Sequence, residues 1–240
     1  MKIVELKTCD STNNFAANLQ RKQKLPYIVR TDYQIRGRGQ AKNSWISDKG
    51  KNLLFSIVFD SKSVPMEKHF FISKFIAICL LELIKKYTCA AVIKWPNDIL
   101  VGTKKIAGIL IENSIIGNRF DKSIAGIGLN VNQLFQDNKL NATSLFEVSG
   151  KEFDISSLLE EFIEIFEKKI EMLTEEKFDR INREYFTHLY KYQEYHSFRQ
   201  AEHQFMAKII DVQDDGLMVL EKEPGNLEKF SFGEIDFLIK

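Results

Sequence analysis

The chain has 240 residues, which is enough for one large domain or for a large domain and a small one. It is 44% hydrophobic and 12% aromatic, so we expect a sizeable core and exclude a chain that stays disordered. Because 34 Lys and Arg residues nearly balance 33 Asp and Glu residues, the net charge of +1 excludes a global attraction to nucleic acid or to an anionic membrane.

The cysteines and the apolar segments indicate a soluble protein of a reducing compartment. Cys9, Cys79 and Cys89 are odd in number and form no CxxC pair, so a disulfide framework or zinc site is not expected. Residues 1–14 lack the apolar core of a secretion signal, and the most apolar run, residues 70–84, contains two charges and is too short to span a bilayer. We therefore expect a cytoplasmic protein with no membrane contact.

The first predicted element is a helix over residues 14–22. Ser11 or Thr12 can cap it, because their side-chain oxygens accept hydrogen bonds from free amides of the first turn. The same residues, with Asn13, place hydroxyls, an amide and helix-start N–H groups where a polar ligand could bind. A simple helix cap explains the segment equally well.

The following elements are predicted from apolar runs and the turns between them. Further along the chain, a helix over residues 157–173 begins with capping-box spacing from Ser157 to Glu160. Between the helix over residues 14–22 and this helix, we expect a strand (27–33), a basic loop (34–44), a strand (53–59), a long helix (66–87), a short strand (92–95), a hairpin (99–112) and a strand (123–131).

The character of the sequence changes after residue 185. Residues 196–240 contain short apolar runs and no helical pattern, with turn signals at residues 214–216 and 223–226. These features predict a small all-β domain of roughly 45 residues, which is near the lower limit for independent folding.

The basic loop is the first segment that suggests chemistry. Gly37 and Gly39 let the backbone approach a ligand closely. Arg36 and Arg38 supply forked donors suited to phosphate or carboxylate. Taken alone, a solvated basic turn or an RGG-like contact to nucleic acid is the better explanation. The position of the loop between a strand and Trp45, which precedes a further apolar strand, favours a ligand-binding loop.

A second segment, KWPND, ends a short strand. Pro96 prevents a helix from continuing, so Asn97 and Asp98 lie at the strand end. An aspartate there can hold Mg²⁺, and an asparagine can bond phosphate or ribose oxygens. An Asx turn that links two strands is an equally good explanation.

A lysine opens the apolar strand that follows. A buried cation is costly without an anion, so Lys105 is suited to a ligand carboxylate or α-phosphate. The alternative, an exposed hairpin end beside Lys104, has equal weight.

Two alternating glycines mark the last segment. Gly126 and Gly128 leave one face of a strand bare, which admits a flat ligand or a closely packed helix. A dinucleotide fold is excluded, because GxGxxG needs a third glycine where Val131 stands and needs a strand-to-helix turn.

Taken in order, five segments resemble the biotin–protein ligase family, and KWPND followed by KIAGIL is the most specific match. The segments are Ser11 to Asn13; Asp32 to Gln34 with Gly37 to Gly39 and Trp45; Lys94 to Asp98; Lys105 to Leu110; and Gly126 to Asn130. The resemblance implies an α+β fold, a mixed β-sheet flanked by helices, related to class II aminoacyl-tRNA synthetases. It also implies a catalytic domain over residues 1–188 and a small SH3-like β domain over residues 189–240.

The resemblance also implies the roles of individual residues. Lys105 and Arg38 would be catalytic. ATP and Mg²⁺ would be contacted by Trp45, Asn97, Asp98 and Asn130, with Asp98 as the metal ligand. Biotin would be contacted by Ser11, Thr12, Asn13, Gln34, Gly37, Arg38, Gly39, Gln40, Lys105, Gly126 and Gly128.

The chain departs from the family in two places. Many members carry an arginine where this chain has Gln40, so either the adenylate is held more loosely or Lys42 substitutes. Only ten residues precede Ser11, which leaves no room for the helix-turn-helix domain of repressor-type members, so we expect no specific DNA binding.

The implied activity is ATP-dependent formation of biotinyl-5′-AMP and transfer of biotin to a lysine of a biotin carboxyl carrier protein or carboxylase domain. A lipoate or octanoate ligase or transferase of the same fold is the nearest alternative, although KWPND and the glycine–arginine loop favour biotin. A nucleic-acid module is disfavoured, because the charge is near neutral and no basic stripe with interleaved aromatics occurs. A homodimer is compatible with this fold, and the sequence leaves the oligomeric state and the carrier open.

Overall fold

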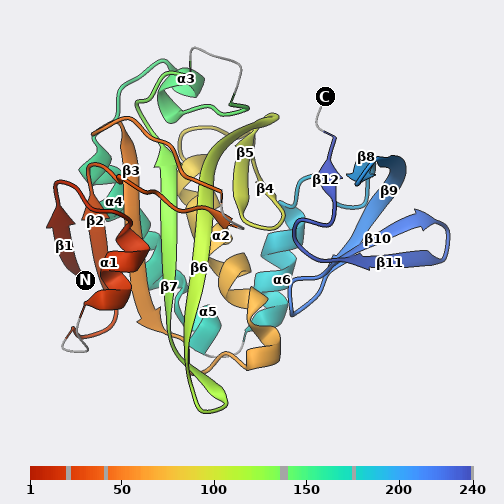
Figure 1. The fold of residues 1–240 in the computed structure, drawn as a ribbon, viewed down its shortest axis with the longest axis horizontal. Helices are drawn as coiled ribbons and strands as arrows, with labels where there is room; N and C mark the ends of the chain where they lie inside the picture. Colours follow the sequence, from red (N-terminus) through yellow and green to blue (C-terminus); the bar gives the residue numbers. More distant parts are fainter. Residues whose placement is uncertain (20–22, 41–42, 136–139, 175–176, 239–240) are drawn as a thin grey trace.

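Two β-sheets joined by helices make up the chain in the computed structural model (Figure 1), which describes residues 1–19, 23–40, 43–135, 140–174 and 177–238. The strand order is β1-β2-β3-β7-β6-β5-β4 in the first sheet and β11-β10-β9-β8-β12 in the second. The first sheet contains β1 (Lys2–Leu6), β2 (Tyr27–Thr31), β3 (Asn52–Asp60), β4 (Ala91–Lys94), β5 (Asp98–Val101), β6 (Lys104–Ile116) and β7 (Arg119–Asn130). The second contains β8 (Tyr195–Gln200), β9 (His203–Val212), β10 (Met218–Glu223), β11 (Asn226–Phe230) and β12 (Asp236–Phe237). The helices are α1 (Thr12–Asn18), η2 (Met66–Lys68), α2 (Phe70–Lys85), α3 (Leu145–Ser149), α4 (Ile155–Lys169), α5 (Glu171–Thr174) and α6 (Phe178–Thr187).

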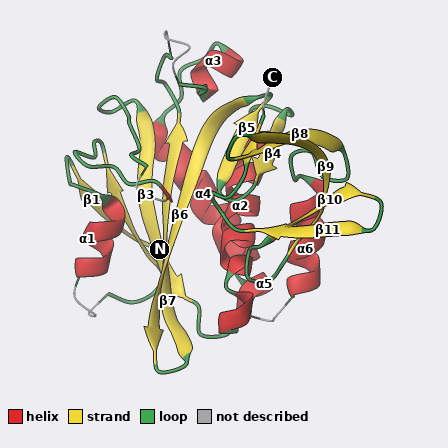
Figure 2. Cartoon of the chain, turned by 45° about the vertical axis from the view of Figure 1, so that its right-hand side comes forward, coloured by secondary structure: helices red, strands yellow, loops and turns green. Residues whose placement is uncertain are grey.

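The expected α+β class is confirmed. β1 and β2 pair in parallel, while β2, β3, β7, β6, β5 and β4 pair antiparallel, so the large sheet is mixed. All pairs of the small C-terminal sheet are antiparallel. Both ribbon views place this second sheet beside α6 (Figures 1 and 2). Among the described residues, no helix is both long and apolar enough to cross a membrane.

The large sheet is covered on both faces, since successive side chains of a strand point to opposite sides. On one face, the rings of Phe55 and Phe162 lie 5.0 Å apart, which joins β3 to α4 within the main core. On the other face, Ala16 of α1 packs with Tyr27 and Val29 of β2. The continuous apolar run of β3 is therefore explained, because both of its faces are buried.

The predicted boundaries of all three helices needed correction, and the helix expected over residues 66–87 is the 3-10 turn η2 followed by α2. α1 begins at Thr12, and its N-cap Ser11 makes no side-chain capping bond, so the expected cap is wrong. α4 begins at Ile155, because Asp154 caps it by accepting from the Ser157 amide at 2.8 Å. The spacing from Ser157 was therefore not a capping box. β1 and α3, which are five residues long, and α6, which is ten, were not predicted.

The small sheet is bonded to the large unit through α2 and the KWPND strand. Lys74 of α2 donates to Asn182 Oδ1 at 2.8 Å and to the Val212 carbonyl at 2.7 Å. The indole of Trp95 donates to the Gly216 carbonyl at 3.0 Å. These bonds fix the turn between β9 and β10, and with it the second sheet, against the β4–β5 turn that carries Trp95 and Asn97.

Lys74 is completely buried, which is unusual for a lysine. Burial lowers the pKa of its ammonium to about 8, while the carboxylates of Asp211 and Asp214 oppose the shift. The folded chain therefore gives up this proton at lower pH than the unfolded chain. Between pH 8 and the ordinary lysine range the unfolded state binds more protons, so this group makes the fold more stable as the pH rises.

Replacing the buried ammonium should remove this pH dependence. For wild type relative to Lys74→Met, the free energy of unfolding should rise by about 2 to 3 kcal/mol from pH 7 to pH 10. Urea unfolding at several pH values measures this difference. Lys104→Met, on an exposed lysine of β6, is the control and should show a constant difference. A constant difference for Lys74→Met as well would contradict the assignment.

Candidate active site

A cavity of about 450 Å³ lies between the large sheet, the basic loop and the start of the last strand of the small sheet. It is on the α1 face, where Gly126 and Gly128 lie on β7. The basic loop closes one side of the cavity through Arg38, Gln40 and Trp45. These three residues were predicted to lie beside a ligand, and the structure brings them together in the cavity wall. Residues from all five segments that carried the family resemblance line this cavity.

Two predicted residues do not line this cavity. Gly37 lies in a neighbouring hollow, where a Cβ would come within 2.4 Å of the Trp45 carbonyl oxygen, so a tight loop turn requires glycine. Asn130 is buried, and its amide donates to the Thr143 carbonyl at 2.9 Å and, at 3.5 Å, to that of Lys105. Asn130 therefore supports the backbone at the start of β6 rather than facing the open space.

A chain of hydrogen bonds lines one end of the cavity. The Thr12 amide donates to Gln34 Oε1 at 2.8 Å, and Ser56 Oγ lies 2.7 Å from Thr12 Oγ1. Ser56 Oγ also lies 2.6 Å from Asn13 Oδ1. This end can present hydroxyl and amide groups to a polar, uncharged ligand head. Sequence reasoning missed Ser56, although a lone hydroxyl in the apolar run of β3 was a usable signal.

The expected bare face of β7 is filled by side chains of the chain itself. A Cβ at Gly126 would lie 2.2 Å from Asn13 Oδ1, and a Cβ at Gly128 would lie 2.4 Å from Cε2 of Trp45. Real Cβ contacts are never this close, so neither position tolerates a larger residue without a shift. The two glycines make room for the asparagine and the indole that face the cavity.

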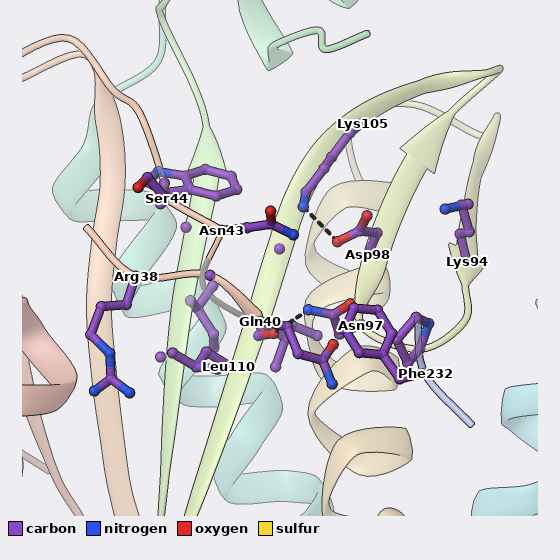
Figure 3. Close-up of a pocket in the computed structure, with 18 of the residues that line it drawn as sticks. Arg38, Gln40, Asn43, Ser44, Lys94, Asn97, Asp98, Lys105, Leu110 and Phe232 are labelled. Atoms are coloured by element: carbon purple, nitrogen blue, oxygen red, sulfur yellow. Dashed lines mark hydrogen bonds and ion pairs between the residues drawn. The ribbon is translucent and has the colours of Figure 1, made fainter. Parts of the chain in front are cut away.

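Lys105 enters the cavity and pairs with a carboxylate (Figure 3). Its Nζ lies 2.6 Å from Asp98 Oδ1 and 5.5 Å from the centre of the Trp45 ring. Lys104 is exposed, whereas Lys105 is partly buried and lines the cavity, so the alternative of an exposed hairpin end is excluded. The ammonium is available to an anion that replaces Asp98.

Arg38 lines the same cavity but extends away from Lys105 and Asp98 (Figure 3). Its guanidinium donates to Asn14 Oδ1 at 2.6 Å and to Glu112 Oε1 at 2.8 Å. Arg38, like Lys105, is thus paired with a carboxylate of the chain. The two pairs neutralise the cations in the absence of a substrate anion.

The KWPND segment forms the opposite wall. Asn97 donates to the Ile109 carbonyl at 2.7 Å, which leaves its amide oxygen free to face a ligand. Burial lowers the pKa of Lys94, the charge of Lys105 lowers it further, and the carboxylates of Asp98 and Asp236 oppose the shift. Lys94 also lines the cavity, which adds a third basic side chain to its wall.

The small sheet supplies part of the wall, which sequence reasoning did not foresee. Phe232, Asp236 and Phe237 line the cavity, and Nζ of Lys94 lies 5.0 Å from the centre of the Phe237 ring. In Figure 3, Phe232 lies next to Asn97. No motif marks these residues, because they reach the site only through the packing of the second sheet.

The donor groups are compatible with a magnesium ion that is held mainly by a nucleotide. Among the described residues, no cluster of three or more His, Cys, Asp or Glu side chains could hold a metal alone. Asp98 offers one carboxylate, whose Oδ1 pairs with Lys105. Mg²⁺ commonly binds through one or two carboxylates together with substrate phosphates, so Asp98 fits that role.

Gln40 lines the cavity at the position where many family members carry an arginine. Its Oε1 is buried and has no hydrogen-bond partner among the described residues. The expected substitute, Lys42, lies outside the described residues. The polar group of Gln40 is therefore uncharged and unsatisfied in this state of the site.

Comparison with known proteins agrees with the fold. Residues 6–130 match the model of the biotin/lipoate A/B protein ligase family. The chain is 29% identical over 203 residues to the bifunctional ligase/repressor BirA of Bacillus spizizenii, covering 82% of the chain and 62% of that protein. It is 30% identical to biotin–protein ligase 2 of Arabidopsis thaliana, covering 76% of the chain and 57% of that protein.

Solved structures show the same fold. A biotin protein ligase from Aquifex aeolicus in complex with biotin and ATP aligns with a TM-score of 0.80 at 24% identity, covering 98% of this chain and 97% of that one. A biotin protein ligase from Leishmania major in complex with biotinyl-5-AMP aligns with a TM-score of 0.65 at 20% identity, covering 96% of this chain and 98% of that one.

The chain belongs to the biotin/lipoate A/B protein ligase family, because the family model covers more than half of its residues. It spans 62% of the length of the first of these relatives and 57% of the second. The segments that carried the resemblance in sequence lie inside this match.

Proposed function

We propose that the chain is a biotin–protein ligase, which forms biotinyl-5′-AMP from biotin and ATP and transfers biotin to a lysine of a carrier domain. The observation that carries the proposal is one cavity with a polar, uncharged end and two anion-exchangeable cations, Lys105 and Arg38. Biotin has the matching chemistry, because its ureido head is polar and neutral and its far end is a carboxylate.

The cavity divides naturally between the two substrates. Thr12, Asn13 and Gln34 would bind the ureido head, while Trp45 and Asn97 lie toward the nucleotide. Lys105 stands between the two ends, next to Gly108, where an added Cβ would lie 3.1 Å from the lysine ammonium. The carboxylate of biotin and the α-phosphate of ATP would meet at this lysine.

The first chemical step joins these two groups. An oxygen of the biotin carboxylate attacks the α-phosphorus, the bond to the bridging oxygen breaks, and pyrophosphate leaves with its electron pair. Several negative charges approach one another, so the residues contribute mainly charge and alignment. Lys105 and Arg38 would leave Asp98 and Glu112 and pair with the reacting carboxylate and phosphate oxygens.

Asp98 would hold Mg²⁺ together with the nucleotide phosphates once Lys105 has moved to the substrate. The ion supplies charge neutralisation on the leaving pyrophosphate. Asn97 is placed to bond a ribose or phosphate oxygen through its free amide oxygen. Trp45 would shield the anhydride from water, because its indole already covers Gly128 in the cavity.

In the second step the amine of a carrier lysine attacks the acyl carbon and AMP leaves. No covalent intermediate on the enzyme is required, and none of the three cysteines lines the cavity. Cys79 is fully buried, and burial strongly raises the pKa of its thiol. The carrier, a biotin carboxyl carrier protein or carboxylase domain, must therefore reach the open mouth of the cavity.

The names of similar proteins favour biotin over the alternative, lipoate or octanoate. The family model includes both activities, but the relatives described above are called biotin ligases. The Aquifex aeolicus protein was solved with biotin and ATP, and the Leishmania major protein with biotinyl-5-AMP. These names support the choice of substrate.

We also propose the organisation that the sequence suggested, with a catalytic domain over residues 1–188 and a small β domain over residues 189–240. The beginning of β8 at Tyr195 supports this boundary. The three unpaired cysteines support a reducing compartment such as the cytoplasm. The expectations of a homodimer and of no specific DNA binding stay predictions.

The direct test is incubation of the chain with ATP, Mg²⁺, biotin and a biotin-acceptor domain, followed by mass spectrometry of the acceptor. The proposal expects one biotinyl group on one lysine, dependent on ATP. Parallel reactions with lipoate and octanoate identify the alternative. Modification by lipoate in preference to biotin would contradict the proposal.

Lys105→Ala should reduce adenylate formation by about a hundredfold or more while leaving the fold intact, because it removes the cation at the reacting carboxylate. Pyrophosphate release in the presence of biotin measures this step. Lys104→Ala, on the exposed neighbouring lysine, is the matched control and should retain activity. Near-normal pyrophosphate release by Lys105→Ala would disprove the proposed role.

Gln40→Arg should make the enzyme hold its adenylate about tenfold longer, because a guanidinium adds charge-assisted hydrogen bonds to the phosphate. The rate at which labelled biotinyl-5′-AMP escapes from a preloaded enzyme measures this. Gln40→Met has similar length without charge and should not slow the escape. An equal rate for the arginine variant and wild type would show that Gln40 does not face the phosphate.

A further inference from the structure

We propose that Glu112 is a positioning residue that holds Arg38 while the site is empty and releases it to the carboxylate of the incoming acid. The inference rests on the proposed function, since it names how the acid end of biotin is recognised. Glu112 lies on β6 and does not line the cavity, so it would act only through other side chains. Sequence reasoning assigned it no role.

The two carboxylate oxygens of Glu112 serve two different parts of the site. Oε1 accepts from a guanidinium nitrogen of Arg38 at 2.8 Å, and Oε2 accepts from Asn13 Nδ2 at 2.7 Å. Arg38 belongs to the loop, whereas Asn13 belongs to the first turn of α1. One side chain therefore connects the loop to the end of the cavity that we assign to the ureido head.

The bond to Asn13 determines which end of that amide faces the site. An ionised carboxylate accepts hydrogen bonds and cannot donate, so it must face the NH₂ group. The carbonyl oxygen of Asn13 is then turned toward Ser56 and over Gly126, as the 2.6 Å contact to Ser56 Oγ requires. Glu112 thereby presents an acceptor to a ligand N–H at this position.

The bond to Arg38 involves the same chemical group that a substrate acid would offer. The pair is weakly held, because the side chains of Arg38 and Glu112 are 43% and 36% exposed and such pairs contribute little. A substrate carboxylate that also pairs with Lys105 would therefore displace Glu112. The exchange leaves no cation without an anion at either stage.

A purely structural ion pair would hold the loop without affecting the choice of ligand. The two roles differ in one respect: only the exchange makes Glu112 a competitor of the ligand's carboxylate. The discriminating measurement compares biotin with biotinol, in which a neutral alcohol replaces the carboxylate. Both ligands keep the same ureido head.

The experiment is calorimetric titration of the full chain with biotin and with biotinol, without ATP, for wild type and Glu112→Gln. Glutamine keeps an oxygen to accept from Asn13 but carries no charge, so it cannot form an ion pair with Arg38. Biotinol affinity should stay within about twofold, while the preference for biotin over biotinol should increase by about two- to fivefold. Glu112→Ala, which also frees Asn13, should weaken the binding of both ligands.

Arg38→Ala provides the control for the exchange. When Arg38 is replaced by alanine, Glu112→Gln should leave the preference for biotin over biotinol unchanged. The reason is that Arg38, the partner for which Glu112 and the ligand carboxylate compete, is missing. Two results for Glu112→Gln with Arg38 intact would overturn the role of Glu112. One is an unchanged preference for biotin over biotinol, and the other is an equal loss of affinity for both ligands. A wild-type chain that binds neither ligand would instead contradict the proposed function, and thermal unfolding confirms that each variant is folded.

Discussion

Lys105 and Arg38 place two full charges in the wall of a cavity, and the whole site depends on keeping both of them paired. A cation removed from water without an anion is costly, so each is held by a carboxylate of the chain, Asp98 for Lys105 and Glu112 for Arg38. A substrate that brings a carboxylate and a phosphate can replace both partners at once. These two cations are therefore neutralised within the chain when the site is empty and complementary to an acyl phosphate when it is filled.

The register of the large sheet creates this arrangement. The pairing of β5 with β6 sets Asp98 opposite Gly108, next to the side chain of Lys105. The pairing of β6 with β7 sets Leu110 opposite Gly126, where the missing side chain leaves room for Asn13. Packing of the second sheet through the fully buried Lys74 closes the cavity from the far side. The positions of the side chains in the cavity are thus determined together by the local sequence, the strand register and the contact between the two sheets.

The sequence was most informative where one physical requirement dominated. The apolar runs of β3 and α2 could only be buried, and the KWPND and glycine segments carried enough specific residues to indicate a shared cavity. Ser56 and Glu112 escaped notice because their roles depend on strand register, which a linear pattern does not reveal. The wall formed by Phe232 and its neighbours depends on docking of the second sheet. The bare face expected at Gly128 is filled because a distant loop folds its tryptophan onto it.

The central claim is that both cations exchange their internal carboxylates for the junction of vitamin and nucleotide. A crystal structure of the chain with a non-hydrolysable analogue of biotinyl-5′-AMP tests it most directly. We expect Lys105 to have left Asp98, Arg38 to have left Glu112, and both side chains to contact the linkage between the acyl group and the phosphate. An analogue bound elsewhere, or bound here with both internal ion pairs intact, would contradict the account.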